Sequence, residues 1–329
     1  GFGAYSASMY SATLTDVQRI KNGDIALDAR NILADGVRKN IDEPAASLGI
    51  GYLLGQKSVL PRGLNEALVV TGLTHIVVAS GYNLTILVRL ARRAFEKVSK
   101  YLSVLTSSAL IIGFIAVTGL SPSMTRAGLV AGLGLWAWYY GRKFHPVTLL
   151  ALAMSVTLIY NPAYAWGDVG WALSFAAFAG VMIVAPVLAK YFWGTVEPSF
   201  VGRLMIETLS AILMTMPITL VVFGKLSVIA VAANMLIVPL VPLAMLLTFV
   251  AGVIGVVLGS SIAIIGMPAQ FLLSTMIMLI EKCANIPWAQ LPVSLTLTGC
   301  LLWYAVIAIA VWYMAKKSDI RLRETSLVE

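Results

Sequence analysis

Two side chains that could act together as nucleophile and base lie in the segment TGLTHIVVASGYNLTIL, residues 71–87. Ser80 could attack a carbonyl carbon if His75 accepted its proton, as in serine hydrolases. On one continuous helix, however, five residues at about 100° each would point the two side chains about 140° apart. The other histidine, His145, follows Arg142 in a short polar stretch. We therefore expect no serine hydrolase site here.

Two further patterns approach catalytic motifs but each lacks an essential part. The stretch GYLLGQKS has Gln56 between the glycine and the Lys-Ser pair that a P-loop requires to be adjacent. Asp168 in WGDVG could belong to an aspartyl membrane protease, but no second aspartate follows within the apolar segments to share its proton. Cys283 and Cys300 form no CxxC pair, so no zinc site is indicated. We predict that the chain is not an enzyme and that it requires no cofactor or metal.

The remaining polar residues cluster at the ends and breaks of apolar runs. They form four groups along the chain: His75, Ser80 and Asn83; Ser121, Ser123 and Arg126; Asn161, Asp168 and Ser174; and Asn234. Each has a simple structural explanation as well, because Asp168 could cap the helix beginning at Val169 and Asn161 could form a turn with the next proline. Together they favour a polar-lined cavity, since an intramembrane charge costs about a few kcal/mol and usually faces a partner or water.

The apolar runs that carry these groups are typical of a polytopic helical membrane protein. Of the 329 residues, 59% are hydrophobic and 12% are charged, against about a quarter charged in a soluble domain. We expect an all-α fold with interrupted or re-entrant helices. Hydropathy predicts about eight or nine membrane segments: 68–90, 102–120, 127–140, 147–160, 169–189, 204–223, 226–258, 262–280 and 295–313.

The chain is expected to divide into four regions. They are a polar helical N-terminal segment at 1–44 that could be the remnant of a larger domain, an interfacial amphipathic region at 45–66, the membrane domain at 67–316 and a basic cytoplasmic tail at 317–329. In the first region, Leu33, Val37 and Ile41 fall on one helix face. Because the sequence opens on Gly1 rather than Met, we expect a fragment or a trimmed chain.

Lysine and arginine residues predict the orientation in the membrane. Most of them lie in alternate loops, which the positive-inside rule makes cytoplasmic: Arg89, Arg92, Arg93, Lys97, Lys100, Arg142, Lys143, Lys190, Arg203, Lys316, Lys317, Arg321 and Arg323. The alternation requires segment 226–258 to count as one crossing, so its first part, interrupted by Asn234, is expected to be re-entrant. The aromatic runs at 138–140 and 312–313 are expected to anchor the cytoplasmic interface.

Three ordered stretches resemble ComEC-type competence proteins. The first, YLLGQKSVLPRGLNEALVVTGLTHIVVASGYNLTIL, is similar to a Leu-Gly turn and amphipathic helix followed by T-G-x-x-H-h-h-A-h-S-G, where h is apolar. The second, at 118–180, is similar to T-G-x-x-x-S/P-x-x-R-A, then N-P, then D-x-G-x-x-L-S-F. The third, at 216–243, is similar to P-h-x-h-x-x-F-x-x-h-S-h-h-x-h-h-A-N-h-h-h-h-P. The three blocks together are specific, although each fragment alone would not be.

The resemblance implies a channel in the bacterial inner membrane that passes single-stranded DNA into the cytoplasm during natural transformation. It places these residues at family motif positions: His75, Ser80, Gly81, Arg126, Asn161, Asp168, Gly170, Ser174 and Asn234. Where many members carry a second histidine this chain has Asn83, so a histidine-pair mechanism is not expected. The partners implied are single-stranded DNA, a separate cytoplasmic motor or DNA-binding protein, and membrane lipids, and a homo-oligomer stays open.

A DNA path needs water, weak hydrogen-bond donors and few acids, because the strand presents a phosphate on each nucleotide. We expect polar lining from His75, Ser80, Asn83, Ser121 and Asn234. Arg126, with helix N-terminal amides, would draw phosphates to the entrance. Asp168 fits this lining poorly, and we expect it to pair with Arg126 or to cap a helix. Two alternatives stay open: a small-solute carrier or permease, and a membrane scaffold whose polar groups only pack helices.

Overall fold

The computed structural model describes residues 25–56, 60–77, 81–119, 122–142, 145–194, 196 and 198–318. Nearly all of these residues are helical. Strands β1 (Lys225–Ser227) and β2 (Gln290–Pro292) pair antiparallel, with Leu226 opposite Leu291, and form the one sheet in this part of the chain. The predicted all-α fold is confirmed.

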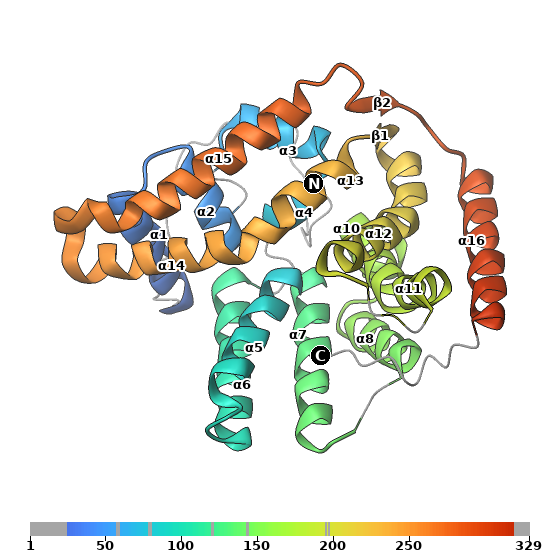
Figure 1. Ribbon diagram of the computed structural model, residues 1–329, viewed down its shortest axis with the longest axis horizontal. Coiled ribbons are helices and arrows are strands. Elements are labelled where there is room, and N and C mark those ends of the chain that lie inside the picture. Colours follow the sequence, from blue (N-terminus) through green and yellow to red (C-terminus); the bar gives the residue numbers. More distant parts are fainter. Residues whose placement is uncertain are drawn as a thin grey trace.

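Breaks separate the helices along the whole described part of the chain (Figure 1). The N-terminal elements are α1 (Ile25–Asn40), α2 (Ala45–Leu54), α3 (Arg62–Val70), α4 (Thr74–Val77), α5 (Gly81–Phe95), α6 (Lys100–Thr118) and α7 (Pro122–Tyr139). The middle elements are α8 (Pro146–Tyr160), α9 (Tyr164–Gly167), α10 (Val169–Ala179), the π-helical turn η2 (Gly180–Val184), α11 (Ala185–Trp193) and α12 (Phe200–Phe223). The last are α13 (Ala230–Ile237), the 3-10 turn η3 (Val238–Leu240), α14 (Val241–Leu258), the 3-10 segment η4 (Gly259–Gly266), α15 (Met267–Ala284) and α16 (Leu297–Lys317).

Six helical stretches of the described chain are long and apolar enough to cross a membrane, as expected of a multi-pass membrane protein. They are Lys100–Thr118, Val169–Trp193, Val201–Phe223, Ala230–Leu258, Ile264–Ala284 and Leu297–Lys317. Each overlaps one predicted segment. The predicted segments 127–140 and 147–160 correspond to α7 and to the shorter apolar helix α8.

The predicted single segment 68–90 is not one helix. Its residues are divided among the end of α3, the one-turn helix α4 and most of α5. Gly72 has a φ of 71°, a left-handed conformation that ends α3 and that residues with a Cβ rarely adopt. Mean hydropathy averages over such breaks, because the residues on both sides are equally apolar. The 140° separation expected between His75 and Ser80 on one helix therefore does not apply.

The predicted interruption in segment 226–258 is confirmed as the 3-10 turn η3. Pro239 and Pro242 lie in and just after this turn, where proline cannot donate an α-helical hydrogen bond. The helical run nevertheless continues from Ala230 to Leu258, and α13 leads into α14 without reversing direction in Figure 1. The expected re-entry on one face is not what the described residues show.

The largest core lies on the left of Figure 1, where α1 and α2 pack against α14 and α15. The expected apolar face of α1 is confirmed, since Val37 and Ile41 are buried there. Backbones approach closely, because a Cβ on Gly255 would collide with the carbonyl oxygen of Gly36. The Asn40 amide donates to the Ala251 carbonyl at 2.9 Å. Small residues are a common means of bringing membrane helices this close.

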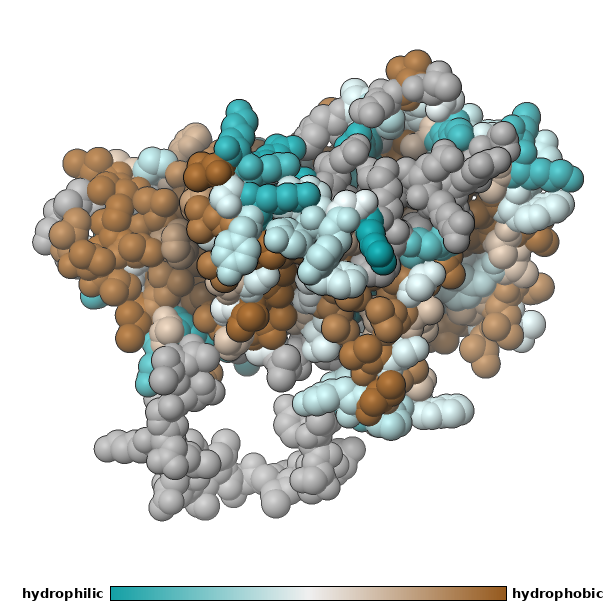
Figure 2. Space-filling view, turned by 90° about the horizontal axis from the view of Figure 1, so that it is seen from below, coloured by the Kyte–Doolittle hydropathy of each residue, from teal (hydrophilic) through white to brown (hydrophobic). Residues whose placement is uncertain are grey.

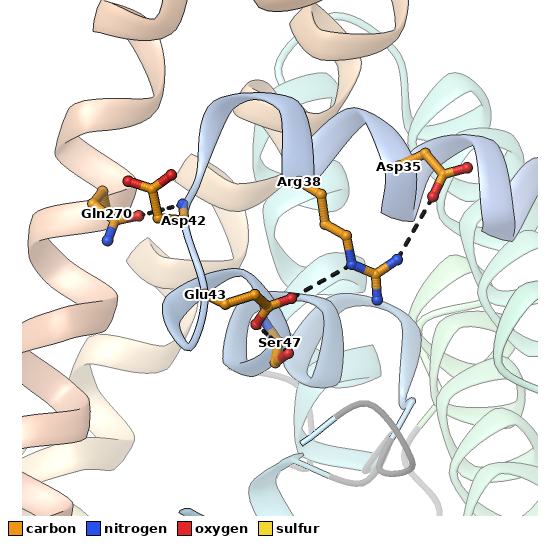
Figure 3. A network of polar contacts seen from close by, with 6 residues as sticks. All are labelled: Asp35, Arg38, Asp42, Glu43, Ser47 and Gln270. Atoms are coloured by element: carbon orange, nitrogen blue, oxygen red, sulfur yellow. Dashed lines mark hydrogen bonds and ion pairs between the residues drawn. The ribbon is translucent and has the colours of Figure 1, made fainter. Parts of the chain in front are cut away.

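A polar network holds the α1–α2 connection onto α15 (Figure 3). The Asp42 amide donates to the Gln270 side chain at 2.8 Å. Arg38 lies within 3.5 Å of Glu43 and 3.6 Å of Asp35, and the Ser47 hydroxyl donates to Glu43. Because the charged side chains are exposed, we attribute little stability to the ion pairs themselves. Their role is to fix the turn between α1 and α2.

The interfacial region predicted at 45–66 contains two different helices. All ten residues of α2 are buried, so this helix is a core element with no face available to a membrane interface. In α3, Leu64, Ala67 and Leu68 are buried while Arg62, Gly63 and Val69 are exposed. The amphipathic pattern therefore belongs to α3. The sequence pattern of α2 was misleading because a helix surrounded by protein needs no polar face.

Hydrophobic side chains cover much of the molecular surface (Figure 2). At the left end of that view, where Figure 1 places α14 and α15, they form a nearly continuous layer. Exposed residues of these helices and their junction include Phe249, Val257, Ile264 and Phe271. In a soluble protein such a layer would mark a partner site, but around apolar helices of spanning length it is the surface that lipid covers.

Candidate functional site

The family-like stretches contribute to one closed series of contacts. Helix α5 contacts α7, α7 contacts α10, α10 contacts α12, and α12 contacts α13. The series closes through Gly72, where a Cβ would lie 3.0 Å from the Ala230 Cβ of α13. The Asn83 amide of α5 donates to the Ile76 carbonyl of α4 at 3.4 Å, which joins α5 to the Gly72 turn. These elements surround a region to which several of the predicted site residues belong.

Arg126 is the central polar residue of this region. It lies in the second turn of α7 and is partly buried. Its Nε donates to the Ser174 Oγ of α10 at 2.7 Å, and that oxygen lies 3.4 Å from the Ser123 Oγ. Ser123 and Arg126 are three residues apart, so they share one face of α7. The second family-like stretch thus folds back on itself and brings its own polar residues together.

Two aromatic rings of α10 complete the surroundings of Arg126. The guanidinium carbon lies 5.0 Å from the ring centroid of Phe178 and 5.9 Å from that of Phe175. Ser174 and Phe178 are four residues apart and therefore face α7 together. An aromatic face attracts a cation without forming an ion pair. Among the described residues Arg126 makes no ion pair with a carboxylate.

Gly81 makes room for this arrangement at the start of α5. A Cβ at this position would lie 2.9 Å from the Ala127 Cβ and 3.3 Å from the Arg126 Nη2. Any side chain would therefore push α5 away from α7 and press on the guanidinium. The predicted motif residues Gly81, Arg126 and Ser174, which come from three separate helices, are thus brought together by the fold.

Asp168 takes the capping role that was one of its two expected roles. Its Oδ1 accepts a hydrogen bond from the Trp171 amide at 2.9 Å at the start of α10. A Cβ on Gly170 would lie 3.1 Å from the same Oδ1. Glycine at this position therefore leaves room for the carboxylate oxygen to accept from the Trp171 amide. The Trp171 indole donates to the Thr157 hydroxyl at 3.0 Å, which ties α10 to α8. The alternative expectation, an Arg126–Asp168 pair, is not what the structure shows.

The two polar residues nearest the α4–α5 junction differ in exposure. His75 is exposed, and its Nδ1 lies 2.9 Å from the Gly72 carbonyl oxygen. Asn83 is fully buried, and its amide donates to the Tyr52 carbonyl of α2 at 3.0 Å as well as to Ile76. Asn83 therefore joins α5 to both the core helix α2 and the short helix α4.

Of the remaining predicted residues, Asn161 and Asn234 make hydrogen bonds to near neighbours along the chain. Asn161 follows α8, and its side-chain oxygen accepts from the Ala163 amide at 3.1 Å, which confirms the expected turn. Asn234 is buried in α13, and its amide donates to the Ala230 carbonyl at 2.8 Å. Ser80 and Ser121 lie outside the described residues. The described chain holds no group of three or more His, Cys, Asp or Glu residues placed to bind a metal.

The sequence prediction did not assign Phe175 or Phe178 to the site, and it named Ser123 only as one of the polar residues grouped with Arg126. A usable signal was present, because Ser174 and Phe178 are spaced to share one face of a helix, as are Ser123 and Arg126. Phenylalanine in an apolar run carries no mark of function by itself. Its contribution depends on which residue of the neighbouring helix it meets, which spacing within one helix does not reveal.

Comparisons with known proteins identify the family. The model of the family described as "Competence protein" matches residues 52–317. The chain is 32% identical over 148 residues to "ComE operon protein 3" of Bacillus subtilis (strain 168), covering 45% of this chain and 18% of that protein. It is 25% identical over 180 residues to an uncharacterized protein of Aquifex aeolicus (strain VF5), covering 53% of this chain and 41% of that protein. The chain thus matches less than half the length of either relative. No solved structure matches it significantly.

Proposed function

Because the chain belongs to the competence protein family, we propose that it passes single-stranded DNA across the bacterial inner membrane during natural transformation. Family membership supports a role in competence and DNA uptake, and the six apolar spans support a location in a membrane. The strand would pass through the region surrounded by α5, α7, α10, α12 and α13. In this role the chain is a conduit and not an enzyme.

The observation that carries the proposal is the environment of Arg126. Its partners are a hydroxyl group and aromatic faces, which orient a guanidinium without neutralising it. A phosphate group is the natural ligand of such a cation, because guanidinium can donate two parallel hydrogen bonds to its oxygens. Passage also requires release, and a single arginine surrounded by weak donors holds each phosphate briefly.

The described residues include a cation that would attract the phosphates of a DNA strand, but we identify among them no group that would supply the energy for moving it. The P-loop-like stretch is interrupted at Gln56, and the acid at the start of α10 is used as a helix cap. We therefore propose that a separate cytoplasmic motor or DNA-binding protein pulls the strand. A homo-oligomer is compatible with this scheme, although the series of contacts around Arg126 is completed within one chain.

The test is the transformation frequency of cells whose only copy of the gene is wild type, deleted, Arg126→Ala or Arg126→Lys. Losing a charged hydrogen-bonding group that contributes about 1.5–3 kcal/mol corresponds to roughly a ten- to hundredfold loss of transformation for Arg126→Ala. Arg126→Lys retains the charge but not the planar donors, so an intermediate loss is expected. Arg93→Ala, which removes an exposed cation of α5, is the matched control.

Membrane abundance of each variant is measured in parallel, because a loss of transformation counts only at wild-type abundance. Unchanged transformation in the deletion strain, with uptake of DNA to the cell surface confirmed, would exclude the proposal. Saturable uptake of a small molecule would then favour a carrier. Altered stability of Arg126→Ala without any transport defect would favour a scaffold.

A further inference from the structure

A groove lies between α6 and α7 at the end opposite to the Arg126 region. It has a volume of about 420 Å³, within the range of small-molecule sites. Its lining residues recur at helical spacing on both helices: Tyr101, Val104, Ser108, Gly132, Leu135, Trp136, Tyr139 and Tyr140. The aromatic residues line one end of the groove, and the small residues Ser108 and Gly132 line the other end.

The aromatic end of the groove is also its cationic end. The Lys100 Nζ lies 5.2 Å from the Trp138 ring centroid and 5.9 Å from that of Tyr139. Arg92 lies 5.3 Å from the same Trp138 ring. Gly141, with a φ of 64°, ends α7 and places the exposed Arg142 just beyond the aromatic residues. The one acid in the α5–α6 connection is Glu96, which leaves this end with an excess of positive charge.

We propose that this groove binds one anionic phospholipid. An acyl chain lies along Val104, Leu135 and Gly132, and the phosphate lies at the Lys100–Arg142 end. The order of chemistry along the groove, from cations through aromatic rings to apolar and small residues, matches the order of groups along a phospholipid. The loop between α5 and α6 and the C-terminal end of α7 share the lower edge of Figure 1, so the groove runs along the bundle from one rim. The proposal does not depend on DNA passage.

The ring geometry favours a lipid over a single nucleic acid strand. A strand would need free ring faces on which bases could stack in series. Here Trp136 and Tyr139 each pack against Tyr140 in edge contacts with centroids 5.1 Å apart, and the Lys100 Nζ lies 5.9 Å from the Tyr139 ring centroid. The rings thus form the walls of a slot. An extended acyl chain fits a slot, whereas a planar base needs a platform.

Two substitutions test the two ends of the groove separately. Nothing lies within 4 Å of a Cβ built on Gly132, so a side chain can begin there without a collision, and we expect Gly132→Leu to fill the groove. Gly113 of α6 is equally unobstructed and lies outside the groove, so Gly113→Leu is the matched control. Lys100→Gln removes a cation but leaves the slot open. All variants must keep the wild-type thermal midpoint in detergent.

The readout is native mass spectrometry of the purified chain with phosphatidylglycerol or phosphatidylcholine of identical acyl chains. We expect one retained phosphatidylglycerol on the wild type and on Gly113→Leu, and at least about tenfold less on Gly132→Leu. Lys100→Gln should reduce the preference for phosphatidylglycerol about fivefold, the effect of roughly one basic residue near an anionic head group. Equal retention by Gly132→Leu and the wild type would overturn the proposal. Displacement of the lipid by oligothymidylate would instead assign the groove to nucleic acid.

Discussion

The α1–α14 contact and the surroundings of Arg126 both depend on glycine, but glycine does different things in them. In the first region Gly255 brings one backbone against another, and the Gly36 carbonyl fills the place of a side chain. In the second, Gly81 leaves space that the end of an arginine side chain occupies. The first region is continuous with the largest hydrophobic core, whereas Arg126 lies among hydroxyl groups and aromatic rings.

This difference indicates that the two regions of the bundle differ in how well they can adjust to a change of side chain. A backbone-to-backbone contact cannot adjust to an added atom, because both helices would have to separate. At Gly81 a new Cβ would meet the fixed Ala127 Cβ, but the Arg126 guanidinium beside it can take another position. We therefore assign rigidity to the α1–α14 region and adjustable polar contacts to the region around α5, α7 and α10. The following substitutions test that division, from the largest effect on stability to the smallest.

The largest effect is expected for Gly255→Ala. The new Cβ would meet the Gly36 carbonyl, which belongs to a helix backbone and cannot turn aside. Overpacking of this kind costs about 3 kcal/mol or more when the neighbour is backbone. Membrane abundance and the thermal midpoint in detergent should both fall sharply. Gly113→Ala, at an exposed position with nothing near its Cβ, should leave them unchanged or slightly raised. Wild-type stability of Gly255→Ala would show that the α1–α14 contact is not rigid, which would contradict the difference proposed between the two regions.

A smaller effect is expected for Asn83→Ala, which acts where the two regions meet. This substitution leaves the buried carbonyls of Tyr52 and Ile76 without the Asn83 donor, at a cost of about 1–3 kcal/mol. The measurement is unfolding by sodium dodecyl sulfate titration. Thr85→Ala is the control, because Thr85 is exposed and its hydroxyl donates within its own helix to Gly81. Equal stabilities of the two variants would mean that Asn83 does not join α5 to α2.

Sequence reasoning predicted the parts of the site that lie within one helix. The cap at Asp168 and the turn at Asn161 depend on neighbours in sequence, and the structure contains both. The partner of Arg126 was different, because the choice between Asp168 and Ser174 depends on how α10 is rotated about its axis. That rotation is set by packing against α7 and α12, which a single sequence does not display.

The same limit explains the errors in the fold. Segment 68–90 is apolar on average despite its polar residues, so mean hydropathy could not locate a break that depends on the φ of Gly72. Helix α2 was predicted at an interface because its apolar stretch is short, ends at Pro61 and is too interrupted to cross a bilayer. The structure packs it against α14 and α15, which are distant in sequence, as well as against the neighbouring α1. Elements whose environment comes from remote segments are the ones that local patterns describe least well.

The smallest effect is expected for Asp168, because an N-cap is worth only about 1 kcal/mol. Asp168→Ala should lower the stability by roughly that amount, whereas Asp168→Asn should keep it, since asparagine also accepts from the Trp171 amide. Thermal unfolding in detergent measures both. The same two variants also test the site, because an electrostatic role for the Asp168 charge toward Arg126 would make Asp168→Asn as harmful to transformation as Asp168→Ala. Wild-type transformation with Asp168→Asn would instead leave Arg126 as the charge on which passage depends, with Asp168 acting only on the helix that carries Ser174.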